Sequence, residues 1–373
     1  MRIRPFRLER FFAGHEFTAR HLLSPSDCET LSLRELLGLA SPESMELWDG
    51  LRFGYTESQG HPLLRSEVAK LYASIRPDDV LIAVPEEAIF LLMHALLDPG
   101  DHVAVVSPAY QSLHEVARSI GCEVTACPVQ AEPPGWRFDL DLLRRSLSGR
   151  TRLLVVNFPH NPTGCLPARE EFDALVDIAR QWGLHLFSDE MYRFLEYDEE
   201  SRLPAACDIY EKAISLSGLS KSFGLPGLRT GWLATRDARL LGRCQTIKDY
   251  TTICHSAPGE VLSIIALRAR SRIAGRNLGI VRRNLTAARA FFANHGGLFR
   301  WMEPRGGPVA FPLWTGPVPL EEFCRRILEE RSVLIVPGSL FEFPGSHFRL
   351  GLGRLSLGEA LTEVADFCEV SLA

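Results

Sequence analysis

Between about residues 80 and 235, short apolar runs alternate with longer stretches in which apolar residues recur at helical spacing. A short apolar run bounded by turn residues is typical of a buried strand, and helical spacing is typical of a helix that covers it. This alternation predicts a mostly parallel sheet with helices on both faces. The expected strands are 102–106, 152–158, 185–188, 214–217 and 232–234, and the expected helices are 86–97, 109–120 and 168–182.

The pattern changes after residue 237. Residues 237–295 are mostly helical, and residues 309–352 mix short apolar runs with one further helix. This second pattern predicts a smaller α+β domain. We therefore expect three parts: an N-terminal arm (1–50) that joins the small domain, a large domain (51–270) and a small C-terminal α+β domain (271–373).

Composition indicates an ordinary folded protein, with 46% hydrophobic and 23% charged residues. The net charge of −5 gives no reason to expect nucleic acid or an anionic membrane as a partner. No apolar run reaches the ~18 residues of a membrane span, and the Arg-rich N-terminus lacks the apolar core of a signal peptide. The nine scattered cysteines are typical of free thiols in a reducing compartment. We expect a cytoplasmic protein with no metal site.

Lysine is rare in this chain, which narrows the search for a reactive amine. Only four of the 41 basic residues are lysine. Lys70, Lys212 and Lys248 each have an acidic neighbour in a helical or turn setting, and we expect all three to be exposed to solvent. Lys221 lies in a Ser- and Gly-rich turn after an expected strand, where a lysine has little structural use. Lys221 is therefore the candidate for amine chemistry.

Three polar segments follow expected strands, at the edge of a parallel sheet where ligands bind. They are Asn157–Gly164 (Asn-Phe-Pro-His-Asn-Pro-Thr-Gly), Ser188–Tyr192 and Ser217–Trp232. Over about residues 50–355 the chain resembles the aspartate-aminotransferase-like family of pyridoxal-phosphate (PLP) enzymes, fold type I. Segments 157–164, 221–232, 247–250 and 304–307 are most similar to the capreomycidine-synthase-like subgroup of that family.

The resemblance implies a fold, a cofactor and an assembly. The fold is a mostly parallel seven-stranded sheet flanked by helices, with a smaller α+β domain beside it. The cofactor is pyridoxal 5′-phosphate, and the partners are an amino acid and a keto acid. The assembly is a homodimer with a shared active site, in which Tyr55 reaches the cofactor phosphate of the neighbouring subunit.

The resemblance also implies roles for the residues at the ends of the strands. Lys221 holds the cofactor as an imine and later moves a proton between substrate and cofactor. Asp189 keeps the pyridine nitrogen protonated, because an opposite charge raises the pKa of that nitrogen. Tyr192 and Asn161 match the residues that hydrogen-bond the 3-oxygen of the ring, and Asn161 also lies where substrate binds. Tyr110 matches the aromatic residue that stacks on the ring.

Two arginines match the anion-binding residues of the family. Arg229 lies eight residues after Lys221, at the spacing of the arginine that binds the cofactor phosphate. Its planar guanidinium suits bidentate binding of a phosphate. Arg349, within the apolar run 348–352, matches the arginine that binds the α-carboxylate of the substrate. A charged residue inside an apolar strand is costly to bury unless it is paired, which itself suggests a bound anion.

The chain departs from the family pattern in the turn that binds phosphate. Family members usually carry a small-residue turn whose backbone amides hold the phosphate at a helix N-terminus. Here the turn contains Pro85, which has no N–H group, and Glu86, which brings a negative charge toward a dianion. We expect either that the loop is rerouted, or that the Glu86 side chain points away while the backbone N–H groups of Glu86 and Glu87 still bind the phosphate.

A second departure lies three residues before the lysine, where Gly218 replaces the hydroxyl residue that is common in the family. Two neighbouring hydroxyl groups are available to take its place on the cofactor. They belong to Ser217 and Ser220.

These residues support three hypotheses. The first is an aminotransferase that moves the amino group of an α-amino acid to a keto acid. The second keeps PLP but catalyses elimination, replacement or cyclisation in natural-product biosynthesis, as in the capreomycidine-synthase-like subgroup. The third is a non-enzymatic PLP-fold protein that acts as a sensor or storage module. The segment from Asp189 to Tyr192 keeps the ordinary aminotransferase form and favours the first. Polar candidates for binding the substrate side chain are His15, Glu16 and Glu57.

Overall fold

The structure is a computed structural model, and it describes residues 2–371. Seven strands form the main sheet in the order β2-β10-β9-β8-β7-β3-β4. Only β10 is antiparallel to its neighbours in this sheet. The predicted mostly parallel seven-stranded sheet is therefore confirmed. The strands are β2 (Val80–Ala83), β3 (His102–Ser107), β4 (Glu123–Pro128), β7 (Thr151–Asn157), β8 (His185–Asp189), β9 (Ala213–Gly218) and β10 (Gly231–Ala234).

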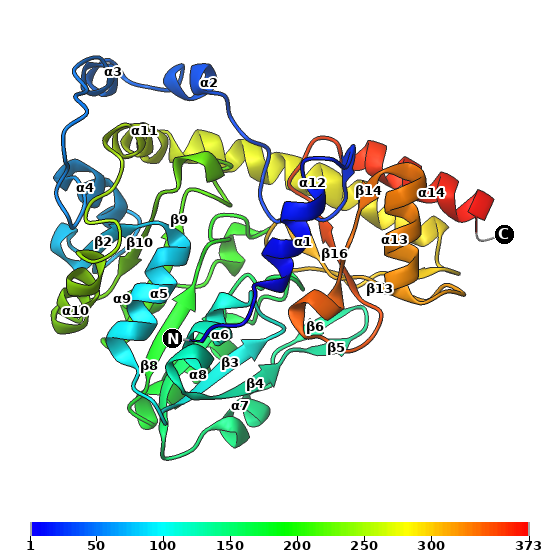
Figure 1. Ribbon diagram of the computed structural model, residues 1–373, viewed down its shortest axis with the longest axis horizontal. Coiled ribbons are helices and arrows are strands. Elements are labelled where there is room, and N and C mark those ends of the chain that lie inside the picture. The colour runs from blue at the N-terminus through cyan, green and yellow to red at the C-terminus, as the bar shows by residue number, and fades with distance from the viewer. Residues whose placement is uncertain (1, 372–373) are drawn as a thin grey trace.

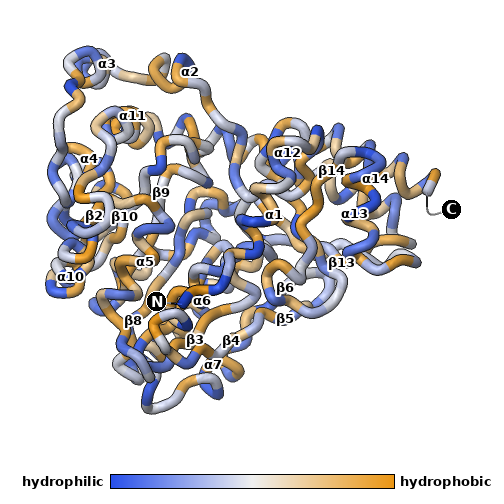
Figure 2. The backbone as a smooth tube through the Cα atoms, viewed as in Figure 1, coloured by the Kyte–Doolittle hydropathy of each residue, from blue (hydrophilic) through white to orange (hydrophobic). Residues whose placement is uncertain are grey.

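Helices cover both faces of this sheet (Figure 1). Alternate residues of β3 show the two faces: Val103 and Val105 pack against α5, α6 and α10, whereas Ala104 and Val106 belong to the cluster that contains α8. Burial on both faces explains why the central strands are continuous apolar runs. Figure 2 shows this apolar character along β3 and α5. The helices are α5 (Pro85–Leu96), α6 (Ser112–Ile120), α7 (Leu140–Ser146), α8 (Arg169–Gln181), α9 (Ala206–Ile209) and α10 (Ala238–Lys248).

The apolar pattern missed the two edge strands, β2 and β4. Strand β2 runs almost directly into α5, so its four apolar residues read as part of one longer apolar stretch. Strand β4 is largely exposed, with one of its six residues buried, and it lacks a continuous apolar run. Edge strands pair on one side only and carry more polar residues, which weakens the signal for them. The hairpin of β5 (Gln130–Glu132) and β6 (Gly135–Arg137) was missed for the same reason.

A second region holds the C-terminal part of the chain, and the long helix α12 leads into it from the main sheet (Figure 1). Its core gathers α12, α13, α14 and the short strands around them. The N-terminal arm contacts both regions: β1 (His21–Leu22) pairs with β14 in the second region, whereas α2 (Leu33–Leu37) and α3 (Pro42–Asp49) pack against α11. The domain boundaries at 50 and 270 stay a prediction.

The remaining elements complete the described chain. They are α1 (Arg7–His15), α4 (Pro62–Ala69), α11 (Ala257–Arg268), α12 (Arg270–Asn294), β11 (Phe299–Arg300), β12 (Val309–Ala310), β13 (Leu313–Trp314), α13 (Leu320–Arg331), β14 (Val333–Leu334), β15 (Val336–Pro337), β16 (Phe348–Gly351) and α14 (Leu357–Ser371). Within residues 2–371, none of the helices has the length and apolar character that crossing a membrane requires.

Candidate active site

A cavity of about 240 Å³ lies at the carboxyl ends of the parallel strands, bounded by the first turn of α5 and by the N-terminal arm. This is the edge at which open α/β sheets bind ligands. Most residues predicted to bind cofactor meet in this cavity. The predicted residues that line it are Glu86, Tyr110, Asn161, Asp189, Tyr192, Ser220, Lys221 and Arg229.

Lys221 presents its amine inside the cavity. The side chain follows β9, and its Nζ donates a hydrogen bond to Ser26 Oγ at 2.8 Å. Burial lowers the pKa of Lys221, and the nearby carboxylate of Asp27 opposes this effect. A lowered pKa increases the fraction of neutral amine, which is the nucleophilic form.

Asp189 ends β8 as a buried carboxyl group. Burial raises its pKa to about 7, while hydrogen bonding from the Met191 N–H and the charge of Lys221 work in the opposite direction. A cation held against this group, such as a protonated pyridine nitrogen, would favour its ionised form. Asn157 fixes the local geometry: its Nδ2 donates to the carbonyl oxygen of Asp189, and its Oδ1 accepts from the Asn161 N–H.

Arg349 carries a buried guanidinium that contacts Asn161. The side chain, on β16, is 1% exposed. Its Nε donates to the carbonyl of Ser24 at 3.0 Å and its Nη1 to Asn161 Oδ1 at 3.3 Å, so both of these partners are neutral. Among the described residues its Nη2 has no hydrogen-bond partner, and neither does the buried hydroxyl of Tyr192. A buried charge without a counter-ion is strongly unfavourable, so the arrangement is suited to an anionic ligand.

The α5 end of the cavity is suited to a phosphate group. No side chain caps the N-terminus of α5 at Val84, which leaves its first N–H groups available. Arg229 lines the cavity nearby and has a φ of 55°, a left-handed conformation that costs a non-glycine residue of order 1 kcal/mol. The Oγ of Ser220 is buried without a partner among the described residues. The uncapped N-terminus of α5, the guanidinium of Arg229 and the hydroxyl of Ser220 are all suited to binding an anion.

The two departures from the family pattern occupy the same space. A Cβ placed on Gly218 would lie 3.2 Å from Cγ of Pro85, and one placed on Gly231 would lie 2.7 Å from the same atom. The proline ring therefore packs over the neighbouring strands β9 and β10 where side chains would otherwise stand. A Cβ on Gly218 would also lie 3.0 Å from the carbonyl oxygen of Thr230 and from Cα of Gly231, so the backbone and Pro85 together crowd a side chain at position 218.

Four predicted site residues lie outside the cavity lining: Arg349, described above, and three of those predicted to bind cofactor. The hydroxyl of Ser217 faces the carbonyl of Glu190 at 3.5 Å, so Ser220 is the serine that reaches the cavity. The carboxylate of Glu87 accepts a hydrogen bond from Thr252 Oγ1 at 2.8 Å, away from the cavity. Tyr55 is 93% exposed on the surface.

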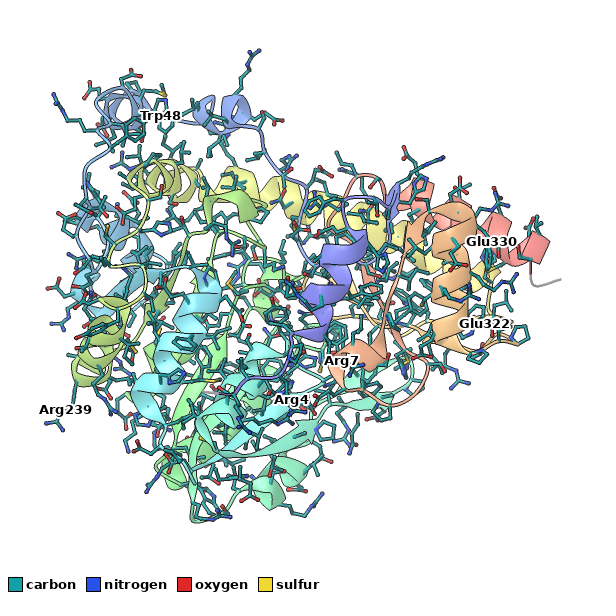
Figure 3. All side chains as sticks on the ribbon, viewed as in Figure 1. Arg4, Arg7, Trp48, Arg239, Glu322 and Glu330 are labelled. Carbon is teal, nitrogen blue, oxygen red and sulfur yellow. The ribbon has the colours of Figure 1, made fainter. Side chains whose placement is uncertain are left out.

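The N-terminal arm supplies two cavity residues that the sequence did not reveal, Glu9 and Ser26. Glu9 lies on α1 and accepts a hydrogen bond from the hydroxyl of Tyr110 at 2.7 Å. Arg4 holds the arm in place through an ion pair with Glu115 at 2.9 Å; Figure 3 labels Arg4 where the arm crosses the middle of the view. No local motif marks such residues, because only the path of the arm brings them to the cavity.

The candidates for binding the substrate side chain lie in different places. The pKa of Glu16 is raised, mainly by burial and to a smaller extent by the negative charges of Asp27 and Glu9. His15 instead lines a separate groove between α1 and α13, and Glu57 is exposed.

The prediction that Lys248 is solvated was wrong. Its side chain is 1% exposed, and Nζ donates to the carbonyl oxygens of Ser58 at 2.8 Å and Ile253 at 2.9 Å. These carbonyls replace the water that a buried ammonium loses. Lys248 therefore joins two loops and stays outside the cavity. The other two lysines are placed as expected, Lys70 beside Glu67 and Lys212 at the surface.

Comparison with known proteins gives the same family from sequence and from structure. Residues 38–365 match the model of the family described as aminotransferase class I and II. Capreomycidine synthase from Streptomyces vinaceus is 34% identical over 341 residues, which cover 90% of this chain and 86% of that protein.

Two solved structures match almost the whole chain. A PLP-dependent aminotransferase from Streptococcus suis 89-1591 has a TM-score of 0.92 at 30% identity, covering 99% of this chain and 98% of the other. The PLP-dependent cyclase OrfR has a TM-score of 0.90 at 31% identity, with the same coverage. The chain belongs to the class I and II aminotransferase family and is a PLP-dependent enzyme of fold type I.

Proposed function

We propose that this enzyme moves the amino group of an α-amino acid to a keto acid, with Lys221 as the amine to which the cofactor attaches. The observation that carries the proposal is Arg349, a buried guanidinium whose recorded hydrogen bonds go to neutral groups. It contacts Asn161, which lines the same cavity as Lys221. An α-carboxylate bound to the free Nη2 would compensate the buried charge and bring the substrate amine toward the cavity.

Each cavity residue has a role in this reaction. Bound PLP supplies the electron sink that makes the α-proton of an amino acid labile. Lys221 Nζ removes that proton, and burial keeps the amine available as a base. Asp189 would pair with the pyridine nitrogen, Tyr192 and Asn161 would donate to the 3-oxygen, and Tyr110 would cover the ring.

The phosphate group would lie at the N-terminus of α5. Arg229 and the hydroxyl of Ser220 are its side-chain partners, and the N–H groups of Glu86 and Glu87 point along the positive end of the helix dipole. The structure supports this site because these groups border one end of the cavity and none of them is committed to another anion in the described chain.

The proposal includes a homodimer in a reducing cytoplasm. Phe53, Tyr55 and Tyr250 are each about nine-tenths exposed, at 90%, 93% and 89%. Exposed aromatic groups of this size are suited to burial against a second subunit, where Tyr55 would reach the partner's phosphate. All nine cysteines are free thiols, eight of them buried, which fits a reducing compartment.

Single-turnover analysis tests the reaction. The cofactor-loaded enzyme is mixed with each of the twenty common amino acids, and the visible absorbance and the products are measured. Formation of the amine form of the cofactor together with a stoichiometric keto acid is the expected result. Loss of the lysine-linked absorbance in Lys221→Ala, with its persistence in Lys212→Ala, would assign the linkage to Lys221. Lysine-linked absorbance that survives in Lys221→Ala would contradict the proposal.

A second candidate function is supported by the relatives. Both capreomycidine synthase and the cyclase OrfR are similar to this chain over most of its length. Such an enzyme would catalyse elimination, replacement or cyclisation on an amino-acid-derived substrate while the cofactor returns to its aldehyde form. The same single-turnover experiment separates the two, because only transamination leaves the cofactor in its amine form. Elimination can also release a keto acid, but with ammonia and with the cofactor returned as the aldehyde.

A further inference from the structure

Glu86 lines the cavity from the first turn of α5 with a half-buried side chain, so it does not point away from the cofactor site. Among the described residues its recorded side-chain hydrogen bond comes from Ser112, with Oγ 3.2 Å from Oε2. Burial, with the charge of Glu9 and Asp189 adding to it, raises the pKa of Glu86 to about 7, although Ser112 and Arg229 act in the opposite direction. The charged and titratable groups facing it are Glu9 on α1, Tyr110 before α6, Asp189 on β8 and Arg229 after the 3-10 turn 226–228.

Arg229 does not neutralise this carboxyl group. Its Nη1 donates to the carbonyl oxygen of Pro226 at 3.0 Å, and within the described chain it forms no ion pair with Glu86. The guanidinium therefore stays available for a ligand. An ionised Glu86 would compete with a phosphate dianion for Arg229 and would repel the dianion directly.

The phosphate end of the cavity lacks two hydrogen-bond donors. Pro85 has no backbone N–H, and Gly218 has no hydroxyl. The two positions are neighbours in space, because the ring of Pro85, together with the backbone of Thr230 and Gly231, crowds the place of a side chain at position 218. A carboxylate cannot replace these donors because it only accepts hydrogen bonds, whereas a neutral carboxylic acid has one O–H donor.

We propose that Glu86 binds the cofactor phosphate as a neutral carboxylic acid, so that the apoprotein takes up one proton from solvent when the cofactor binds. The proton adds to one carboxylate oxygen, and the new O–H group donates to a phosphate oxygen. This inference rests on the proposed function, because it requires the phosphate at the N-terminus of α5.

The coupling has a defined direction with pH. Below the titration of Glu86 in the apoprotein, the group is already protonated and cofactor binding requires no further proton. Above it, each binding event must draw a proton from solvent, so affinity falls by up to ~10-fold per pH unit. The fall ends at the higher pKa that Glu86 has beside the bound dianion.

Cofactor titrations of three apoproteins test the proposal: wild type, Glu86→Gln and Glu123→Gln. Glu123 is the control, because its exposed carboxylate pairs with Arg150 outside the cavity. The apparent Kd for PLP is measured from pH 6 to 9 by visible absorbance, and proton uptake is measured by calorimetry in buffers of different ionisation enthalpy. The same titrations with pyridoxal, which lacks the phosphate, complete the set.

Above pH 7 the affinity of wild type for PLP is expected to fall more steeply than that of Glu86→Gln. The difference between the two is up to ~10-fold per pH unit. Glu123→Gln follows wild type, and wild type takes up about one proton more than Glu86→Gln. With pyridoxal the three pH profiles coincide. Equal slopes and equal proton counts for wild type and Glu86→Gln with PLP would overturn the inference, as would a difference that persists with pyridoxal.

A second variant covers the case in which Glu86→Gln does not fold. Ser112→Ala removes the hydroxyl that stabilises the ionised carboxylate, so the fall in PLP affinity should begin at higher pH than in wild type. An unchanged or lower onset contradicts the inference. If wild type binds PLP but shows no lysine-linked absorbance, the proposed function itself fails, whereas normal linkage with equal slopes rejects only the role of Glu86.

Discussion

Asp189 and Glu86 are two carboxyl groups that line one cavity, and removal from water is the largest cause that raises the pKa of each to about 7. Asp189 is buried at the end of β8 with the cation Lys221 close by, in the region that matches the family. Glu86 is half-buried in the first turn of α5, in the region that departs from it. We propose that the ligand decides the charge of each group. A protonated pyridine nitrogen would favour the ionised form of Asp189, whereas a phosphate dianion would favour the protonated form of Glu86.

The largest expected effect comes from removing the amine of Lys221, which follows β9. We expect Lys221→Ala to lower turnover by more than ~10⁴-fold and to abolish the lysine-linked absorbance, because no other lysine lines the cavity. Steady-state kinetics and visible spectra measure both. Lys212→Ala, at an exposed lysine that donates to the Gly183 carbonyl, serves as the control and should resemble wild type.

Asp189→Asn tests whether the strand-end carboxyl must be ionised. The amide keeps the shape and the hydrogen bond from the Met191 N–H but cannot pair with a protonated ring nitrogen. We expect kcat to fall by roughly 100-fold or more while bound cofactor remains, since the loss is one of charge stabilisation. Measurement of kcat with the cofactor content determined on the same sample decides it. A near wild-type kcat would show that an ionised Asp189 is not required, and the contrast drawn between Asp189 and Glu86 would then fail.

Arg349→Lys tests whether Arg349 binds the α-carboxylate of the substrate. Lysine keeps the charge but loses the bidentate geometry, so KM for the amino acid should rise by about 10- to 100-fold with a smaller change in kcat. The control is a substrate amine without the α-carboxylate, for which the variant and wild type should differ little. Equal losses for both substrates would indicate that Arg349 acts on the fold instead of on the carboxylate.

The smallest effect concerns the stability of the apoprotein. Because the pKa of folded Glu86 is raised above its ordinary value of 4.5 to about 7, the folded state holds the proton more tightly than the unfolded state. The free energy of unfolding therefore falls as pH rises through this window and levels off above it, by of order 1 kcal/mol per pH unit. Glu86→Gln removes this dependence, so the variant should gain stability relative to wild type at pH 8.5 compared with pH 5.5.

Urea unfolding of the apoproteins at these two pH values measures this gain. Glu123→Gln is the control and should show no such gain, because its carboxyl group is exposed and pairs with Arg150 outside the cavity. An identical pH dependence of the free energy of unfolding in wild type and Glu86→Gln would contradict the raised pKa of Glu86 on which the comparison with Asp189 rests.

The strand-end residues could be identified from sequence because of how parallel sheets are built. Asn161, Asp189 and Lys221 follow β7, β8 and β9, and adjacent parallel strands end at the same edge. Local order along the chain therefore predicts spatial proximity in this region. The five inner strands of the sheet were predicted for a related reason, since burial on both faces leaves a continuous apolar run.

Other features depend on contacts between residues far apart in sequence. Glu9 and Ser26 reach the cavity only because the arm is held by Glu115 and pairs with β14. Lys248 is buried because carbonyl oxygens from two loops surround its ammonium, and no local pattern shows these.

The sequence by itself determined the family and the cofactor and singled out Lys221 as the candidate amine, because that chemistry needs particular residue types at the ends of consecutive strands. Only the tertiary structure decided how the phosphate end is built. There Pro85 packs over Gly218 and Gly231, and Glu86 turns its carboxyl group into the cavity. Burial and charge at that point are sums over neighbours from several elements, which a linear chain does not display.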